Sequence, residues 1–370
     1  MPENSTHSFR IDNVAMRYSD FAPRLFNYCL SLGMKPNQIM PSRAFCSDEN
    51  QGYPIILLAK HFGAFPFNHG RVGGIVATDR HAPHASHGKD VVIIQASHVG
   101  YDPESERFGI YRRLQTEAQE MSTDCGAICG VLDWYRAEYD FACHQIGLDR
   151  DGIRYTVVID NQLLRDDRDE GVFLNLDRMI DSHTLLHSYS TAKAYPASKY
   201  LIERIGDDWP GQKMAIGHYL YPELFRFKRN SDDMVASGLL NRNLINAMPD
   251  IISSHSPELA GAQVNAQMEF DRTFRSIVKE EAYRGKKVVF VSGIHVDVSP
   301  REGQLFPLTK FVPWAAYIQN ESGEGYTLEQ QELYEALLEQ SKENPHKIDL
   351  TAAIHQMESE PEVRLHVDDE

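Results

Sequence analysis

The stretch Lys89–Asp102, KDVVIIQASHVGYD, predicts the central element of the fold. A charged pair opens it, and the unbroken apolar run Val91–Ile94 follows. A short β-branched run between polar residues is typical of a strand buried on both faces of a parallel sheet. In such sheets function gathers at the carboxyl ends of the strands. His98 falls at that position, so it is either a hydrogen-bonded structural histidine or a functional residue, and the residues around it must decide.

The composition limits the class of protein. Of the 370 residues, 42% are hydrophobic and 24% are charged, which is ordinary for a globular chain of one large or two ordinary domains. The net charge of −16 disfavours a nucleic acid partner, because phosphate binding needs a basic surface. No apolar run approaches the roughly 20 residues of a membrane span, and the first residues lack the features of a secretory signal. We therefore expect a cytoplasmic protein with no membrane partner.

A second buried run at residues 286–300, KKVVFVSGIHVDVSP, repeats the order of apolar residues, serine, glycine and histidine. Both strands could bring histidines to one edge of a sheet. We predict an α/β fold with a mostly parallel central sheet flanked by helices. Residues 1–325 are expected to form a single α/β catalytic domain that includes a mainly helical segment at about 165–285. Residues 326–370 are expected to form a charged helix and an acidic tail.

The five cysteines are an odd, sparse set, which argues against a disulfide framework and favours metal binding or burial. Cys46 is predicted to end a strand, and Cys125 to lie at a helix N-terminus, where the dipole favours a thiolate. With His98 they offer two thiolates and an imidazole, which are natural zinc ligands, and three protein ligands leave the fourth position open for catalysis. Cys129 and Cys143 are the alternatives for the third ligand.

Asp48 follows Cys46 with the spacing C-x-D, which in an extended chain places thiolate and carboxylate on the same side. The carboxylate would either accept a hydrogen bond from a zinc-bound hydroxide or take the fourth ligand position itself. A neighbouring arginine would keep it ionised. Arg80 and Arg71 are the candidates, and we select Arg80.

Four short motifs carry a resemblance to a known family: Cys46–Glu49, the phenylalanine- and glycine-rich residues 62–74, Ala96–Gly100 and Cys125–Ile128. Over roughly residues 40–135 the chain resembles the low-CO2-inducible protein B/C (LCIB/LCIC) family. That family is similar in fold to the β-carbonic anhydrases and uses zinc on two cysteines and one histidine. The resemblance therefore implies a β-carbonic-anhydrase-like fold, a Zn²⁺ cofactor and a homodimer.

Residue by residue, the resemblance implies zinc on Cys46, His98 and Cys125, with Asp48 as the neighbouring carboxylate. One position departs from the pattern. The β-carbonic anhydrases have an arginine two residues after the aspartate, as C-x-D-x-R, and this chain has Asn50 there. An arginine partner for Asp48 would have to come from elsewhere in the chain.

The implied function is the reversible hydration of CO2 to bicarbonate by zinc-bound hydroxide, with Asp48 and Arg80 as catalytic residues. The small-molecule substrate would be held against an apolar wall. We predict a substrate pocket lined by Phe45, Phe62, Phe65, Phe67 and His81. For the phenylalanines, plain core packing is the alternative. A histidine of the 81–87 loop (His81, His84 or His87) could carry the released proton to solvent, because its pKa lies near the working range.

Two other functions fit the same residues. One is a different zinc hydrolase, which would use His81, His84 and His87 together with His295 and Asp297. The other is a catalytically inactive, carbonic-anhydrase-like zinc protein that forms an assembly or handles bicarbonate.

Metal content after mutation separates the carbonic-anhydrase-type site from the hydrolase. Because it removes a ligand, Cys46→Ser should abolish zinc binding measured by plasma emission, whereas His81→Ala combined with His84→Ala should leave it unchanged. The reverse result would favour the hydrolase. Stoichiometric zinc in Cys125→Ser would move the third ligand to Cys129 or Cys143.

Overall fold

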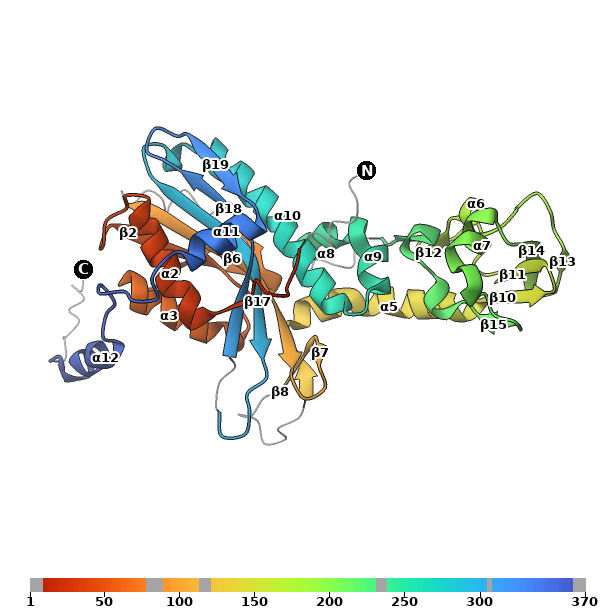
Figure 1. Ribbon diagram of the computed structural model, residues 1–370, viewed down its shortest axis with the longest axis horizontal. Coiled ribbons are helices and arrows are strands. Elements are labelled where there is room, and N and C mark those ends of the chain that lie inside the picture. Colours follow the sequence, from red (N-terminus) through yellow and green to blue (C-terminus); the bar gives the residue numbers. More distant parts are fainter. Residues whose placement is uncertain (1–8, 78–88, 113–120, 231–237, 305–307, 362–370) are drawn as a thin grey trace, which may run out of the picture.

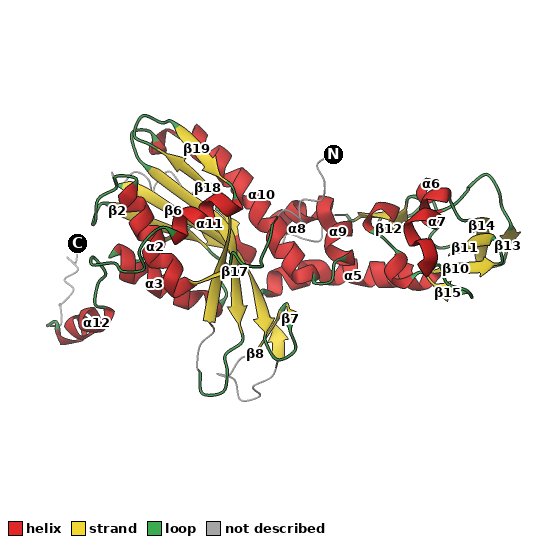
Figure 2. Cartoon of the chain, in the orientation of Figure 1, coloured by secondary structure: helices red, strands yellow, loops and turns green. Residues whose placement is uncertain are grey.

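The structure is a computed structural model that describes residues 9–77, 89–112, 121–230, 238–304 and 308–361. Figure 1 shows an elongated molecule with a large sheet at one end and a smaller lobe at the other. The long helix α5 (Gly126–Gln145) runs from the large sheet to this lobe. We call residues 146–228 the distal lobe. Figure 2 shows that helices cover the large sheet, whereas the tip of the distal lobe consists mainly of strands and loops.

A central sheet of eight strands carries the fold. In pairing order its main path is β1 (Met16–Arg17), β18 (Leu308–Gln319), β17 (Val288–Val298), β6 (Asp90–Asp102), β2 (Ile39–Ala44) and β3 (Phe67–Asn68). Two further strands lie off this path, β19 (Gly325–Leu328) beside β18 and β7 (Arg107–Phe108) beside β6.

The central sheet is mixed rather than mostly parallel. Strands β17, β6, β2 and β3 pair in parallel, whereas β1, β18, β19 and β7 each pair antiparallel with their neighbours. One reason that the sheet is mixed is the short connection between β17 and β18, residues 299–307. A connection between parallel strands needs a dozen or more residues, so a shorter one joins antiparallel strands. The predicted parallel sheet is therefore limited to four strands.

Strand β6 confirms the buried strand predicted from its sequence, and its side chains alternate between two cores. Val92 and Ile94 belong to the core on the α2 (Tyr18–Ser31) and α3 (Gly52–Phe62) side. Val91 and Ile93 belong to the core on the opposite face, with the helix α10 (Pro257–Lys279). A strand covered on both faces needs apolar residues at successive positions, which is the pattern of this run.

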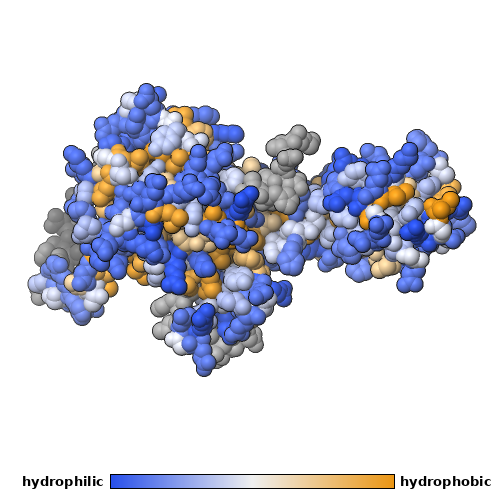
Figure 3. Space-filling view, in the orientation of Figure 1, coloured by the Kyte–Doolittle hydropathy of each residue, from blue (hydrophilic) through white to orange (hydrophobic). Residues whose placement is uncertain are grey.

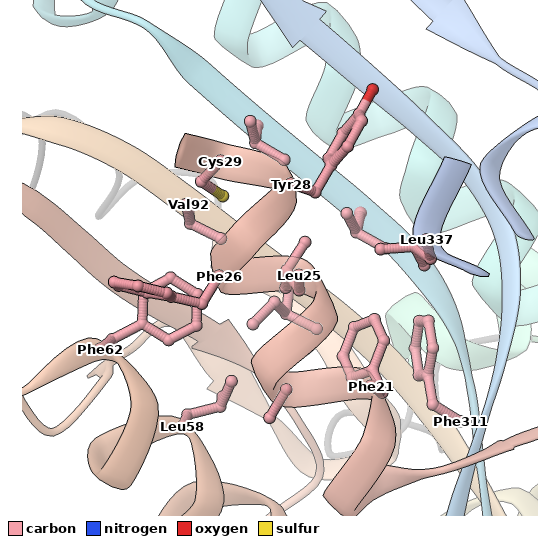
Figure 4. Close-up of a cluster of buried hydrophobic side chains, with 14 of the residues drawn as sticks. Phe21, Leu25, Phe26, Tyr28, Cys29, Leu58, Phe62, Val92, Phe311 and Leu337 are labelled. Atoms are coloured by element: carbon pink, nitrogen blue, oxygen red, sulfur yellow. The ribbon is translucent and has the colours of Figure 1, made fainter. Parts of the chain in front are cut away.

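Aromatic side chains fill the core between the sheet and α2. Figure 4 shows Phe21 of α2 beside Phe311 of β18, and their rings stack with centroids 4.0 Å apart. Phe62, at the end of α3, contacts Phe26 edge-on at 5.3 Å. Phe62 is therefore a core residue. The helix α11 (Gln330–Leu338) adds Leu337 to this core, and α12 (Leu350–Ser359) follows it.

The distal lobe has its own antiparallel sheet and apolar core. The five strands of this sheet are β13 (His187–Ser188), β14 (Ala192–Pro196), β11 (Arg154–Asp160), β10 (Ile146–Asp151) and β15 (Met214–Ala215). The rest of the lobe contains the pair β12 (Gly171–Leu174) and β16 (Phe225–Lys228) and the helices α6 (Leu176–Met179) and α7 (Lys199–Ile205). Figure 3 shows a mostly hydrophilic surface over this lobe, with small hydrophobic patches.

The segment at 165–285, predicted to be mainly helical, has two different parts. The part up to residue 228 contains short strands of the distal lobe, whose two to five residues give too weak an alternation to recognise in the sequence. The second part is helical, with α8 (Gly238–Leu244), α9 (Met248–Ser253) and α10. Within the described ranges, no helix combines the length and apolar character needed to span a bilayer.

Truncation of Phe21 tests the packing of α2. Phe21 is fully buried, so Phe21→Ala should lower the free energy of unfolding by about 3–5 kcal/mol through lost burial and a cavity. The matched control Phe65→Ala, at a side chain that is 72% exposed, should change it by less than about 0.5 kcal/mol. Urea unfolding followed by circular dichroism measures both. Equal effects would contradict this assignment of the core.

Candidate metal centre

Three buried side chains from distant parts of the sequence meet beside the central sheet. Cys46 follows β2, His98 lies within β6, and Cys125 directly precedes α5. One potential ligand atom from each lies within 4.8 Å of the other two. The structure thus brings together the three residues that the sequence predicted as metal ligands.

The parallel pairing of β6 and β17 places His98 among residues of the second buried run. His98 is the register partner of His295, and Asp297 lies two residues further along β17. Side chains two apart on a strand share a face, so His295 and Asp297 lie on the face that carries His98. The strand continues past His98 to Asp102, so the histidine lies inside the strand and not at its end.

A buried carboxylate fixes the orientation of His98. Its Nδ1 lies 3.1 Å from Oδ2 of Asp297, and both side chains are fully buried. Gln51 Nε2 donates to the same oxygen at 2.9 Å, and Thr309 Oγ1 donates to Oδ1 at 2.9 Å. Nε2 of His98 is buried with no hydrogen-bond partner among the described residues. This arrangement directs the Nε2 lone pair toward the two cysteines, because a histidine ligand usually donates its other N–H to a carboxylate.

The thiols and the imidazole share protons within the site. The pKa of Cys46 is lowered to about 3, first because Cys125 donates a hydrogen bond to its thiolate and also because His98 lies beside it. Burial opposes protonation of His98, but the negative charge shared by the cysteine pair, the carboxylate of Asp124 and the hydrogen bonds to Asp124 and Asp297 outweigh burial and raise the pKa of His98 well above its ordinary value. Burial raises the pKa of Asp297 to about 6. A divalent cation would replace these shared protons, because thiolates bind metals in their deprotonated form.

A group of carboxylates borders the same centre. Asp48, His98 and Asp124 form a second set whose potential ligand atoms lie within 4.8 Å of one another. Asp48 is half-buried, and burial is the largest cause that raises the pKa of its carboxyl group. Asn50 donates its side-chain amide to Asp124 at 3.0 Å and its backbone N–H to Asp48 at 3.0 Å. Asn50, at the position where the β-carbonic anhydrases have an arginine, therefore links the carboxylates of Asp48 and Asp124 through hydrogen bonds from uncharged donors.

The loop after β4 (Gly70–Arg71) closes over Cys46. The backbone N–H of Gly73 donates to Cys46 Sγ at 3.1 Å, which stabilises a thiolate. Gly74 has a φ of +73°, and a Cβ there would lie 2.4 Å from the carbonyl oxygen of Ala96, so only glycine fits. Asn265 of α10 holds this loop, because its Nδ2 donates to the carbonyl of Gly73 at 2.9 Å.

Cys125 has a backbone conformation that is unusual for its residue type. Its φ of 52° and ψ of 67° are left-handed, a region that non-glycine residues seldom adopt. It turns the chain from β9 (Met121–Thr123) into α5, and it is the N-cap residue of that helix. Such conformations persist where the surroundings enforce them, and they cluster at functional sites.

The two alternative cysteine ligands lie elsewhere. Cys129 Sγ is 3.4 Å from the backbone oxygen of Asp124, and burial raises the pKa of its thiol to about 11. Cys143 Sγ is 3.4 Å from the backbone oxygen of Gly217 in the distal lobe. Within the described residues, neither cysteine is a member of a candidate metal group.

The structure does not assemble the predicted aromatic wall. Phe45 is buried and directly precedes Cys46 in the chain. The centroid of its ring lies 4.6 Å from that of His295. Phe62 instead fills the core between α2 and α3, because the apolar face of α3 turns it toward the sheet. Phe65 is 72% exposed and Phe67 is 38% exposed. Only Phe45 of these four lies beside the site.

The other predicted site residues fall into two groups. Arg71 is described and its side chain is exposed. The second group lies outside the part of the chain that the structure describes and consists of Arg80, His81, His84 and His87. Their catalytic, pocket and proton-transfer roles stay predictions.

Sequence reasoning missed part of the supporting shell. No pattern in the sequence singled out Asp124 or Gln51. Asp297 was assigned to a rival site, although its place in a second strand of the same pattern was the available signal. The structure unites it with His98 instead.

Comparison with known proteins supports the fold alone. No family model matches the chain, and no curated protein matches it in sequence. The crystal structure of PtLCIB4, a homolog of the limiting CO2-inducible protein LCIB, matches with a TM-score of 0.53 and 12% sequence identity, over 85% of this chain and 94% of that chain. A mutant of PtLCIB4 matches with a TM-score of 0.54 and 11% identity, over 85% and 93%.

The chain has the fold of this LCIB homolog. The resemblance predicted from four short motifs is thus confirmed at the level of fold. The LCIB-like fold places Cys46, His98 and Cys125 within reach of one cation. Two sulfurs and an imidazole nitrogen are donors that suit zinc, and Nε2 of His98 is available because Nδ1 is already bonded to Asp297. The residues present therefore fit a zinc ion.

Mutation of the carboxylate behind His98 tests this assignment. Asp297→Asn should weaken zinc binding by about 10–100-fold, because the imidazole loses its charged acceptor. Competition with a chromogenic chelator measures the affinity. The control Asp167→Asn, an exposed carboxylate paired with Arg165 in the distal lobe, should leave it unchanged. Unchanged affinity in Asp297→Asn would show that Asp297 does not support the metal ligand.

Proposed function

We propose that the chain is a zinc-dependent carbonic anhydrase that hydrates CO2 reversibly to bicarbonate. The observation that carries the proposal is the buried Cys46–His98–Cys125 group, in which Nδ1 of His98 is held by Asp297 and Nε2 has no hydrogen-bond partner among the described residues. When bound, zinc would supply a Lewis acid with an open position that makes water acidic enough to react at neutral pH.

The chain's own residues would bind zinc and orient the reacting water. Cys46, His98 and Cys125 would be the ligands. Asp48 lies close to His98 and Asp124, and we propose that it accepts a hydrogen bond from the water and so directs its lone pair to CO2. The buried ring of Phe45 beside the site would give CO2 an apolar surface. We further propose a cytoplasmic homodimer in which residues 1–325 act as one catalytic domain.

The second candidate function is a zinc protein of the same fold without hydration activity. Asn50 favours it, because it occupies the position of an arginine and offers Asp48 only a neutral backbone donor. Burial raises the pKa of Asp48, and the uncharged Asn50 supplies no positive charge to oppose that effect. This candidate predicts stoichiometric zinc with no hydration of CO2.

Stopped-flow CO2 hydration with a pH indicator tests the proposed activity. The zinc-loaded chain should accelerate hydration above the buffer rate, and Cys46→Ser should return it to that rate because a ligand is lost. Asp48→Asn should retain zinc and lower kcat/KM by about a hundredfold or more, since it removes the group that orients water.

The control for these variants is Cys143→Ser, which makes the same change at a cysteine outside the candidate metal group. It should retain both zinc and activity. A fully zinc-loaded wild type with no activity above buffer in mildly alkaline solution would exclude the enzyme and leave the inactive zinc protein.

A further inference from the structure

Beside the metal centre, on the α2 face of the sheet, lies a second cluster of polar side chains. It consists of Tyr18 at the start of α2, Arg43 in β2 and His295 in β17. The rings of Tyr18 and His295 meet edge-on with centroids 5.0 Å apart. The ring of Phe45 joins the cluster, 4.6 Å from that of His295 and 5.9 Å from the guanidinium carbon of Arg43.

Each of the three polar residues has a buried atom without a partner. Tyr18 Oη, Arg43 Nε and His295 Nε2 have no hydrogen-bond partner in the part of the chain that the structure describes. Tyr18 and His295 are both fully buried. Native proteins pair nearly all such atoms with protein groups, ordered water or a bound ligand. Three unpaired atoms in one cluster therefore indicate a position for a small polar ligand.

The hydrogen-bonding roles of the cluster follow from its neighbours. Gln51 donates through Nε2 to Asp297, so its Oε1 is the acceptor for Nδ1–H of His295 at 2.6 Å. Nε2 of a neutral His295 is then an acceptor. Burial raises the pKa of the Tyr18 hydroxyl well above its ordinary value, so the hydroxyl keeps its proton and can donate.

Arg43 gives the cluster a positive charge. Its guanidinium is half-buried and has no carboxylate partner in the described part of the chain. The cluster therefore offers one charged donor, one neutral donor and one acceptor. A ligand that satisfies all three accepts two hydrogen bonds and donates one through an O–H of its own, and a negative charge on it would also offset the charge of Arg43.

We propose that Tyr18, Arg43 and His295 form a binding subsite for a small protonated oxyanion, hydrogencarbonate. The O–H of the anion donates to Nε2 of His295, and its charged oxygens accept from Arg43 and Tyr18. Nitrate has the same planar shape and charge but no proton, so it cannot satisfy His295. The choice of hydrogencarbonate among protonated oxyanions rests on the proposed function. The subsite itself shares no residue with the candidate metal ligands.

Isothermal titration of the metal-depleted full chain tests this subsite, with sodium hydrogencarbonate and sodium nitrate as the probes. Hydrogencarbonate should bind at one site, and nitrate should bind at least about tenfold more weakly because it lacks the donor. Tyr18→Phe and Arg43→Gln should each weaken hydrogencarbonate by about tenfold or more. The control Arg17→Gln removes the same charge from an exposed neighbour and should bind like wild type.

Three results would overturn the subsite. They are no hydrogencarbonate binding, equal binding of the two anions, and wild-type binding by Tyr18→Phe and Arg43→Gln. If metal depletion unfolds the chain, the comparison of wild type with Tyr18→Phe is made on zinc-loaded protein, where loss of one hydrogencarbonate site is expected and identical binding would refute the proposal.

The same protein separates this proposal from the proposed function. If the chain binds hydrogencarbonate in the expected pattern but fails to hydrate CO2, the subsite is supported and the proposed carbonic anhydrase activity is refuted. If the chain hydrates CO2 but does not bind hydrogencarbonate without its metal, the activity is supported and the subsite is refuted.

Discussion

The hydrogen bond between His98 and Asp297 is the interaction on which the site depends. It links neighbouring parallel strands, so it forms only in the register that pairs His98 with His295. A slip of one residue would turn Asp297 to the opposite face and leave a buried imidazole without its acceptor. The apolar runs of β6 and β17 hold that register, because each strand fills cores on both faces of the sheet.

The rest of the molecule supports this strand pair from two directions. Helix α10 packs on one face, and its Asn265 fixes the loop whose Gly73 donates to Cys46. Helix α5 begins directly after Cys125 and ends in the core of the distal lobe, to which it contributes Ala142. The distal lobe is therefore packed on the helix that positions a candidate ligand, and its own core helps to hold that helix in place.

The sequence predicted the elements whose signal is local. The buried strand at β6, its counterpart at β17 and the Cys46, His98, Cys125 set are each visible as short patterns, and the structure brings the three residues together. The contact between Asp297 and His98 was not predicted, because it depends on the register between two strands far apart in sequence. Asp124 reaches the site from the turn before α5, which has no pattern that points to His98. The strands of the distal lobe beyond residue 165 were missed because they have only two to five residues each. The predicted aromatic wall failed because Phe62 satisfies a core between two helices, which composition alone does not distinguish from a pocket.

X-ray absorption at the zinc K-edge of the zinc-loaded chain tests the central claim most directly. We predict one zinc per chain with two sulfur neighbours at about 2.3 Å, one imidazole nitrogen at about 2.0 Å and a light atom in the remaining position. A zinc surrounded only by nitrogen and oxygen would contradict it, because Cys46 and Cys125 would then lie outside the coordination sphere.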